Sequence, residues 1–87
     1  MKDVLFLGHA FNQYTAWASE NLKKHQKISE LIRDISRHPF SGLGKPEPLK
    51  HEYKGAWSRR IDEEHRLVYS VSGDVITILS CKFHYDE

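Results

Sequence analysis

The strongest constraint on the fold is a change of hydrophobic period across residues 39–48, a segment rich in proline and glycine. Before this segment, apolar side chains recur at the i, i+3, i+4 and i+7 spacing of an amphipathic helix: Ile28, Leu31, Ile32 and Ile35. The opposite side of that helix is charged and includes Asp34. Pro39 ends the helix, because proline has no amide proton and its ring clashes with the preceding turn. After the segment, apolar and polar residues alternate as in strands.

The remaining patterns give the order of the expected elements. Residues 4–7 form a short apolar run typical of a buried strand, and residues 11–18 carry aromatic and small residues at helical spacing. Strands are expected at 49–53, 57–61, 67–71 and 75–83, with turns at 54–55, 62–64 and 72–74. Because the helices precede the strands, the sequence favours one α+β domain over residues 1–87, with two N-terminal helices on a mainly antiparallel, twisted sheet.

Charge is distributed unevenly along the 87 residues, although the net charge is only +1. Residues 21–60 hold ten Lys and Arg against four acids, while the segments on either side are net acidic. A basic middle can contact phosphates even in a nearly neutral protein, because surface charges act over only about 8–10 Å. Cys81 is the single cysteine, which excludes an internal disulfide, and no apolar run is long enough to span a membrane. We expect a cytoplasmic protein.

Two short motifs resemble known sites but lack their spacing. Residues 42–45 contain two glycines and a lysine, yet they precede a proline-bounded loop and not the helix of a phosphate-binding loop. The Glu64-His65 pair has no second histidine one helical turn away, so it does not form a zinc protease site, and His65 is expected in a turn or on the surface. No metal or cofactor is expected.

A third set of residues has the chemistry to cleave RNA. Attack by the RNA 2′-hydroxyl needs a base, an acid for the leaving oxygen and cations for the phosphorane, and it needs no metal. Acid, cation and base types occur together in the loop, the strands and the terminus: Glu47, Arg59, Arg60, Arg66, His84 and Tyr85, with Lys50 available to hold a phosphate. The alternative is structural: Glu47 caps a loop, Arg66 pairs with neighbouring acids, and His84 is a solvated terminal residue.

The order and spacing of these residues resemble the YoeB toxins of the RelE superfamily. The resemblance is carried by PFSGLGKPEPLKH at 39–51, GAWSRRI at 55–61, EEHRLVY at 63–69 and the final His84-Tyr85 pair. It implies a RelE-like fold and a toxin that cleaves mRNA in the ribosomal A site. The implied reaction is 2′-hydroxyl attack that leaves a 2′,3′-cyclic phosphate.

The resemblance also implies a role for each site residue. Glu47 matches the general base, His84 the general acid and Arg66 the arginine that stabilises the transition state. Tyr85 matches the tyrosine that orients the substrate. Lys50 and Arg60 match positions that hold mRNA or assist catalysis. Arg59 is included among the RNA-binding candidates, but strand alternation puts it on the opposite face from Arg60.

The partners implied are the 70S ribosome with its 16S and 23S RNA, mRNA, and a YefM-type antitoxin whose complex represses its own operon. Operator DNA is contacted only through that complex, and a homodimer is possible. One departure from the family opens an alternative: Asp86-Glu87 follows the His-Tyr pair, and these acids could weaken catalysis and leave an antitoxin-binding module that acts in operon autoregulation. A ParE-like inhibitor of DNA gyrase is a third possibility on the same fold.

Overall fold

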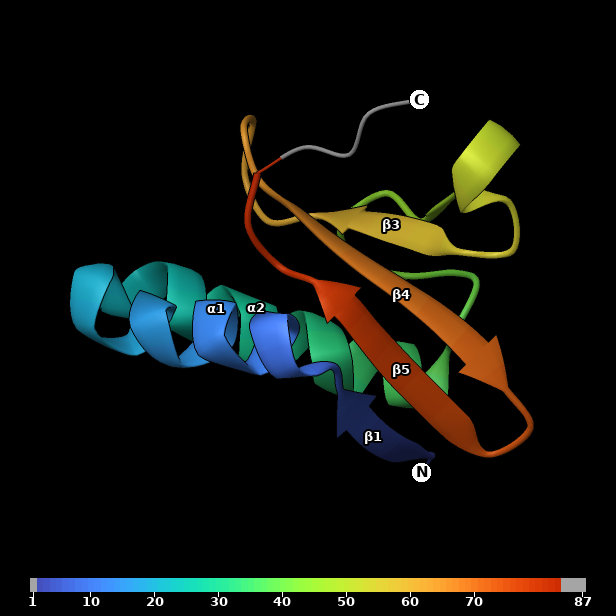
Figure 1. Ribbon diagram of the computed structural model, residues 1–87, viewed down its shortest axis with the longest axis horizontal. Helices are drawn as coiled ribbons and strands as arrows, with labels where there is room; N and C mark the ends of the chain where they lie inside the picture. The colour runs from blue at the N-terminus through green and yellow to red at the C-terminus, as the bar shows by residue number, and fades with distance from the viewer. Residues whose placement is uncertain (1, 84–87) are drawn as a thin grey trace.

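Two helices cover one side of a five-stranded sheet in this protein, whose computed structural model describes residues 2–83 (Figure 1). The elements follow in the order β1 (Asp3–Phe6), α1 (Gly8–Glu20), α2 (Leu22–Arg37), β2 (Glu47–Pro48), the 3-10 helix η1 (His51–Tyr53), β3 (Trp57–Arg60), β4 (Arg66–Ser72) and β5 (Val75–Ser80). The strand order is β1-β5-β4-β3-β2; β1 pairs parallel with β5, and every other pair is antiparallel. The predicted α+β class with a mainly antiparallel sheet is confirmed.

A single asparagine joins the two helices. The Asn21 backbone N–H donates to the Trp17 carbonyl at 2.8 Å and closes α1, while the Asn21 side chain accepts from the Lys24 amide at 3.3 Å and caps α2. An asparagine at this position satisfies amide groups that have no partner inside the helix. At its far end α2 stops at Arg37, two residues before Pro39, as the sequence predicts. No helix within residues 2–83 has the length and apolar character needed to cross a bilayer.

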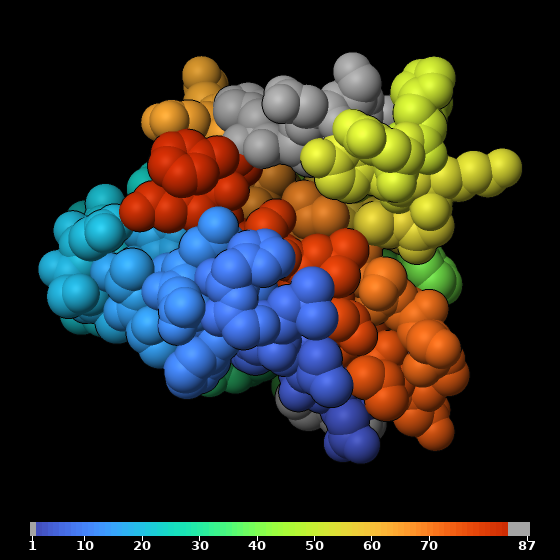
Figure 2. All heavy atoms as spheres, in the orientation of Figure 1, coloured from blue at the N-terminus to red at the C-terminus, as the bar shows by residue number. Residues whose placement is uncertain are grey.

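The sheet has an apolar layer on each face, and the two layers differ in size. The larger one lies between the sheet and both helices, and in Figure 2 the blue atoms of α1 pack directly on the red and orange atoms of β5. The smaller one lies on the other face, where Val68 packs with Leu49 and Ala56. We call this second side, which the helices do not cover, the open face. Alternation along β4 explains both layers, since Leu67 and Tyr69 point to the helices and Val68 points away.

Two predicted strands differ from the structure: one is absent and one is too long. Residues 49–53 do not form a strand, because the Ala56 amide donates to the Tyr53 carbonyl and the chain turns through η1. The last strand ends at Ser80 and does not reach residue 83. There, the Cys81 amide donates to the Gln13 side chain at 2.7 Å, so helix α1 takes a backbone group that a strand would need.

Candidate functional site

The open face gathers three of the residues predicted to act on RNA. In the register of β2, β3 and β4, Glu47 pairs with Ser58, and Arg60 pairs with Arg66. Directly paired residues point to the same side of a sheet, and so do residues two positions apart, such as Ser58 and Arg60. Glu47, Arg60 and Arg66 therefore project from the open face. Glu47 and Arg66 lie two strand spacings apart across the sheet, about 10 Å, and two residues apart along it, about 7 Å. The two positions are therefore roughly 12 Å apart, and both long side chains can reach toward one phosphodiester between them.

Arg66 is held at the start of β4 by backbone oxygens. Its Nη1 donates to the carbonyls of Asp62, Glu63 and His65, at 2.7, 3.3 and 3.1 Å. The hydrogen bonds of this guanidinium within residues 2–83 all use Nη1, which leaves Nε and Nη2 to bind an oxyanion. The acceptors are backbone carbonyls of the preceding turn. The alternative prediction, in which Arg66 pairs with the acidic side chains of that turn, expected different partners. The guanidinium is thus oriented as well as charged.

Two further cations flank the open face. Arg60 is exposed and lies directly beside Arg66 across the β3–β4 ladder. Lys50 is also exposed, and it follows Leu49, whose side chain is buried against Val68 on this face. Exposed cations can bind the phosphates of any RNA sequence, because every nucleotide carries the same phosphate charge. Both Lys50 and Arg60 are exposed to solvent.

The loop between α2 and β2 carries Glu47 to the sheet edge, and Gly44 lets it pack there. Gly44 has φ +78°, a conformation that side chains rarely adopt. A Cβ at this position would lie 2.9 Å from Leu31 Cδ2 and 3.1 Å from the Arg60 carbonyl oxygen. The Gly44 carbonyl also accepts from the Arg60 amide at 2.7 Å. The loop therefore lies directly on α2 and β3, with no room for a larger residue.

Arg59 holds the same loop from the helix side. Its guanidinium donates to Asp34 Oδ2 at 2.7 Å and, through Nε, to the Tyr69 hydroxyl at 3.1 Å. It also donates to three loop carbonyls, those of His38, Ser41 and Leu43. We call Arg59, Asp34 and Tyr69 the loop anchor. A buried cation with this many acceptors fixes the path of the chain that leads to Glu47.

The burial of Arg59 contradicts the prediction that it contacts RNA. Its side chain is 0% exposed, because alternation along β3 turns it under the helices while Arg60 faces out. Asp34 is not a solvent-facing residue of α2 but the counterion of Arg59, whose hydrogen bond keeps the pKa of Asp34 below its usual value. Burial raises the pKa of Tyr69, so its hydroxyl stays protonated and donates to the Pro39 carbonyl at 2.6 Å.

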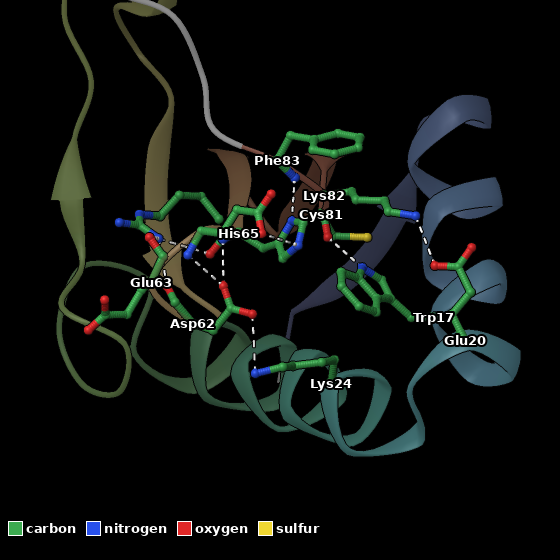
Figure 3. A network of polar contacts seen from close by, with 11 residues as sticks. Trp17, Glu20, Lys24, Asp62, Glu63, His65, Cys81, Lys82 and Phe83 are labelled. Carbon is green, nitrogen blue, oxygen red and sulfur yellow. Dashed lines mark hydrogen bonds and ion pairs between the residues drawn. The ribbon is translucent and has the colours of Figure 1, made fainter.

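The end of the described chain is bound by His65, as Figure 3 shows, and by the backbone of Arg66. The Phe83 backbone N–H donates to His65 Nδ1 at 2.7 Å, and the Phe83 carbonyl accepts from the Arg66 amide at 3.1 Å. Two residues earlier, Trp17 Nε1 donates to the Cys81 carbonyl at 2.8 Å. We call Trp17, His65 and Arg66 the tail anchor. It ties the segment after β5 to both α1 and the start of β4.

The two remaining predicted residues, His84 and Tyr85, lie outside the described residues. His84 follows Phe83 directly in the sequence. The described chain therefore ends one residue before the predicted general acid, at a residue hydrogen-bonded to the Arg66 backbone. The catalytic roles of both residues stay predictions.

His65 is a residue whose importance the sequence did not reveal. It was expected in a turn or on the surface, but its side chain is only 12% exposed, and its ring lies 4.9 Å from that of Trp17 and 5.5 Å from that of Phe83. Its only signal in the sequence is its position next to Arg66. Cys81, by contrast, is excluded as a nucleophile, because burial raises the pKa of its thiol to about 12. Among residues 2–83 no three His, Cys, Asp or Glu side chains cluster as metal ligands.

Comparison with known proteins identifies the family. A family model described as the YoeB-like toxin of bacterial type II toxin-antitoxin systems matches residues 6–85. The chain belongs to this family. Toxin YoeB of Escherichia coli K12 is 51% identical over 82 residues, which cover 94% of this chain and 98% of that protein. The predicted family is thus confirmed, and with it the coarse function of a type II toxin.

Solved structures of this family share the fold closely. A YoeB/ParE toxin from Agrobacterium tumefaciens has a TM-score of 0.93 at 44% identity, over 95% of this chain and 99% of that chain. YoeB from Staphylococcus aureus has been solved as a dimer and in a YoeB-YefM complex, with TM-scores of 0.90 and 0.89 at 44% identity. These cover 97% and 98% of this chain and 98% and 99% of theirs.

Proposed function

We propose that this toxin is an endoribonuclease that cuts mRNA in the ribosomal A site and so stops translation. The observation that carries the proposal is the register that puts Glu47, Arg60 and Arg66 on one face of the sheet. Neither α1 nor α2 covers this face, and Glu47 and Arg60 are exposed on it, so RNA can reach them. Membership of the YoeB-like family supports the same conclusion.

The proposed reaction is a metal-independent transesterification. Glu47 takes the proton of a 2′-hydroxyl, and the freed oxygen attacks the adjacent phosphorus. Arg66 donates to the non-bridging oxygens as negative charge builds on them. The bond from phosphorus to the 5′ oxygen then breaks, and His84 gives that oxygen a proton. The products are a 2′,3′-cyclic phosphate and a 5′-hydroxyl end, so protons and electrons balance without a cofactor.

The other predicted residues bind and orient the substrate. Lys50 and Arg60 hold phosphates on either side of the scissile bond, which their exposure permits. Tyr85 stacks on or orients a base, as aromatic residues do with single-stranded nucleic acid. The ribosome supplies the remaining alignment by presenting one codon at a time.

The proposed partners are a YefM-type antitoxin, the 70S ribosome through its 16S and 23S RNA, and mRNA, in the cytoplasm. The S. aureus relative has been solved both as a dimer and with YefM, which supports an antitoxin complex and a homodimer here. Operator DNA is bound only through the antitoxin complex. Contact with ribosomal RNA falls to the basic segment 21–60, whose net charge is +6.

Cleavage on programmed ribosomes tests the proposal. The purified full chain is added to 70S ribosomes with a defined codon in the A site, and the mRNA ends are mapped. We expect cuts within that codon with 2′,3′-cyclic phosphate ends, and none on the same mRNA without ribosomes. A pair of variants completes the test: Arg60→Ala should cleave more slowly, and Asn12→Ala, at an exposed position of α1 outside the basic segment, should not. Intact mRNA at every codon would contradict the proposal.

The same preparation separates the two alternatives. If the full chain and a truncation lacking Asp86 and Glu87 both fail to cleave but bind the antitoxin and its operator, the protein is an antitoxin-binding module. If they instead inhibit supercoiling by DNA gyrase, it is a ParE-like toxin. Cleavage by the truncation alone would show that the acidic residues weaken a competent site.

A further inference from the structure

Residues 81–83, which follow β5, are held mainly by hydrogen bonds to side chains, whereas a strand is held by backbone hydrogen bonds to neighbouring strands. The Cys81 amide is bound by Gln13 and the Cys81 carbonyl by Trp17, at 2.7 and 2.8 Å. The Phe83 amide donates to His65 Nδ1 at 2.7 Å (Figure 3). Among contacts within residues 2–83, the Phe83 carbonyl alone in this segment has a backbone partner, the Arg66 amide. The path of the chain up to Phe83 therefore depends on the side chains of Gln13, Trp17 and His65.

Phe83 also has an unfavourable backbone conformation. Its φ is +66°, in the left-handed region that residues with a Cβ rarely enter. Phe83 is 57% exposed, so burial does not explain this conformation. A strained residue persists only when surrounding contacts determine it, and such residues concentrate at functional sites. The contacts at hand are the two backbone hydrogen bonds to His65 and Arg66.

His65 is itself fixed by contacts with Asp62 and Trp17. Its backbone amide donates to Asp62 Oδ1 at 2.6 Å, and Asp62 Oδ2 pairs with Lys24 of α2 at 3.1 Å. The Trp17 ring of α1 meets the His65 ring edge-on, with 84° between their planes. Burial opposes ionisation of Asp62, but hydrogen bonds from the amides of His65 and Glu64 and from Lys24 outweigh it and lower its pKa. A charged Asp62 thus holds the turn that presents His65.

The hydrogen bond defines the state of the imidazole. Nδ1 accepts from an N–H group, so it carries no proton, and the ring proton sits on Nε2. Nε2 lies 3.6 Å from Glu64 Oε1, which favours that arrangement. An aromatic ring without a nitrogen at this position would keep the packing and lose the bond.

We propose that His65 is a positioning residue for the cleavage reaction: its Nδ1 fixes the Phe83 backbone and hence the point from which His84 begins. This inference rests on the proposed function, in which His84 protonates the leaving oxygen. His65 does not touch the substrate in this scheme. Its contribution is to hold Phe83, whose carbonyl also accepts from the Arg66 amide, so that the chain continues toward His84 from a fixed point. Misplacement of a catalytic group by about 1 Å can cost about 100-fold in rate.

Three variants separate the hydrogen bond from the packing of the ring. His65→Phe keeps an aromatic ring between Trp17 and Phe83 but has no acceptor. His65→Asn puts an amide oxygen near the position of Nδ1, and His65→Gln puts it near the position of Nε2. Single-turnover cleavage and ribosome affinity are measured for each. We expect roughly 10- to 100-fold slower cleavage for His65→Phe and His65→Gln with affinity changed less than about 2-fold, and a rate within a few-fold of the unaltered chain for His65→Asn.

Two results would overturn the inference. One is a cleavage rate for His65→Phe equal to that of the unaltered chain. The other is a rate for His65→Asn as low as for His65→Phe, which would mean that the ring and not the acceptor matters. Thermal unfolding of each variant shows whether it folds, so a collapsed variant is not mistaken for a slow one.

A measurement on the free protein tests the inference without cleavage. Hydrogen exchange of the Phe83 amide, followed by NMR, should be at least about 10-fold faster in His65→Phe than in the unaltered chain and should recover in His65→Asn. The Arg60 amide, which donates to the Gly44 carbonyl and does not contact the tail anchor, is the internal reference. If the unaltered chain cleaves no mRNA, the proposed function fails, and Phe83 exchange still decides whether His65 holds the segment. If cleavage occurs but exchange at Phe83 is the same in all variants, the positioning role fails alone.

Discussion

The loop anchor and the tail anchor perform the same task by different physical means. Each fixes a segment next to a predicted catalytic residue, the loop before Glu47 in one case and residues 81–83 before His84 in the other. The loop anchor uses a buried guanidinium with an anionic partner, whereas the tail anchor acts on Phe83 through a neutral imidazole and one backbone amide. The first should dominate stability, and the second should matter mainly for catalysis. The predictions below test that division, from the largest expected effect on stability to the smallest.

Breaking the loop anchor should have the largest effect. Asp34→Ala leaves the Arg59 guanidinium buried without its counterion, and removal of one partner of a buried pair costs about 3–5 kcal/mol. Urea denaturation should show the loss as a lower midpoint with an unchanged slope. Arg37→Ala, on the exposed side of the same helix, should stay within about 0.5 kcal/mol of the unaltered chain. Equal effects of the two substitutions would show that the buried pair contributes nothing.

The close packing of the loop gives the next effect. Gly44→Ala adds a methyl group where Leu31 and the Arg60 carbonyl leave no space, at an unfavourable φ, and should cost about 2–3 kcal/mol. Gly73→Ala is the control, because its φ is also positive, +57°, but nothing lies within 4 Å of the added group. It should cost about 1 kcal/mol. Calorimetry can compare the two, and a Gly73 variant as unstable as the Gly44 variant would exclude packing as the cause.

Acid should weaken both anchors, because each depends on a charged aspartate with a lowered pKa, Asp34 or Asp62. A carboxyl with a lowered pKa in the folded state stabilises the fold above its unfolded pKa, about 3.9, and loses that stabilisation as the pH falls through the lower folded value. The free energy of unfolding should therefore fall as the pH drops from about 5 to below 4. In Asp34→Asn the free energy of unfolding, measured by urea denaturation at each pH across this range, should fall less steeply with pH. The same pH dependence as in the unaltered chain would contradict a stabilising role for the charge of Asp34.

The tail anchor should contribute least to stability. His65→Phe removes one hydrogen bond from an exposed residue and keeps an aromatic ring, so the expected loss is about 1 kcal/mol or less. The informative quantity is the difference between the losses in free energy of unfolding of His65→Phe and Asp34→Ala. A loss as large as that of Asp34→Ala, in the same urea experiment, would mean that the two anchors do not divide stability and positioning between them.

The sequence predicted most of the elements and the opposite faces of Arg59 and Arg60, because both depend on local periods. The spacing of residues 28–35 was enough for α2, and alternation around Arg60 was enough to separate its face from that of Arg59. What it could not show was which face the helices would cover, since that depends on packing between distant elements. Arg59 is buried for this reason, although a charged residue in a strand is usually exposed.

The tail anchor was beyond local patterns altogether. His65 acquires its role from a residue 18 positions away, and β5 ends at Ser80 because side chains of α1 bind the Cys81 backbone. Residues 75–83 have continuous strand character, so only the tertiary structure reveals where the ladder stops. The family resemblance supplied the identities of the predicted catalytic residues but not the contacts that support them.

The most direct test of the account is single-turnover cleavage of ribosome-bound mRNA by Glu47→Gln. The substitution keeps the size of the side chain and removes its ability to take a proton. The account predicts a rate about 100- to 10,000-fold below that of the unaltered chain, with ribosome affinity and unfolding midpoint unchanged, since the side chain is exposed. Cleavage by Glu47→Gln at the rate of the unaltered chain would contradict the claim that the open face carries the chemistry.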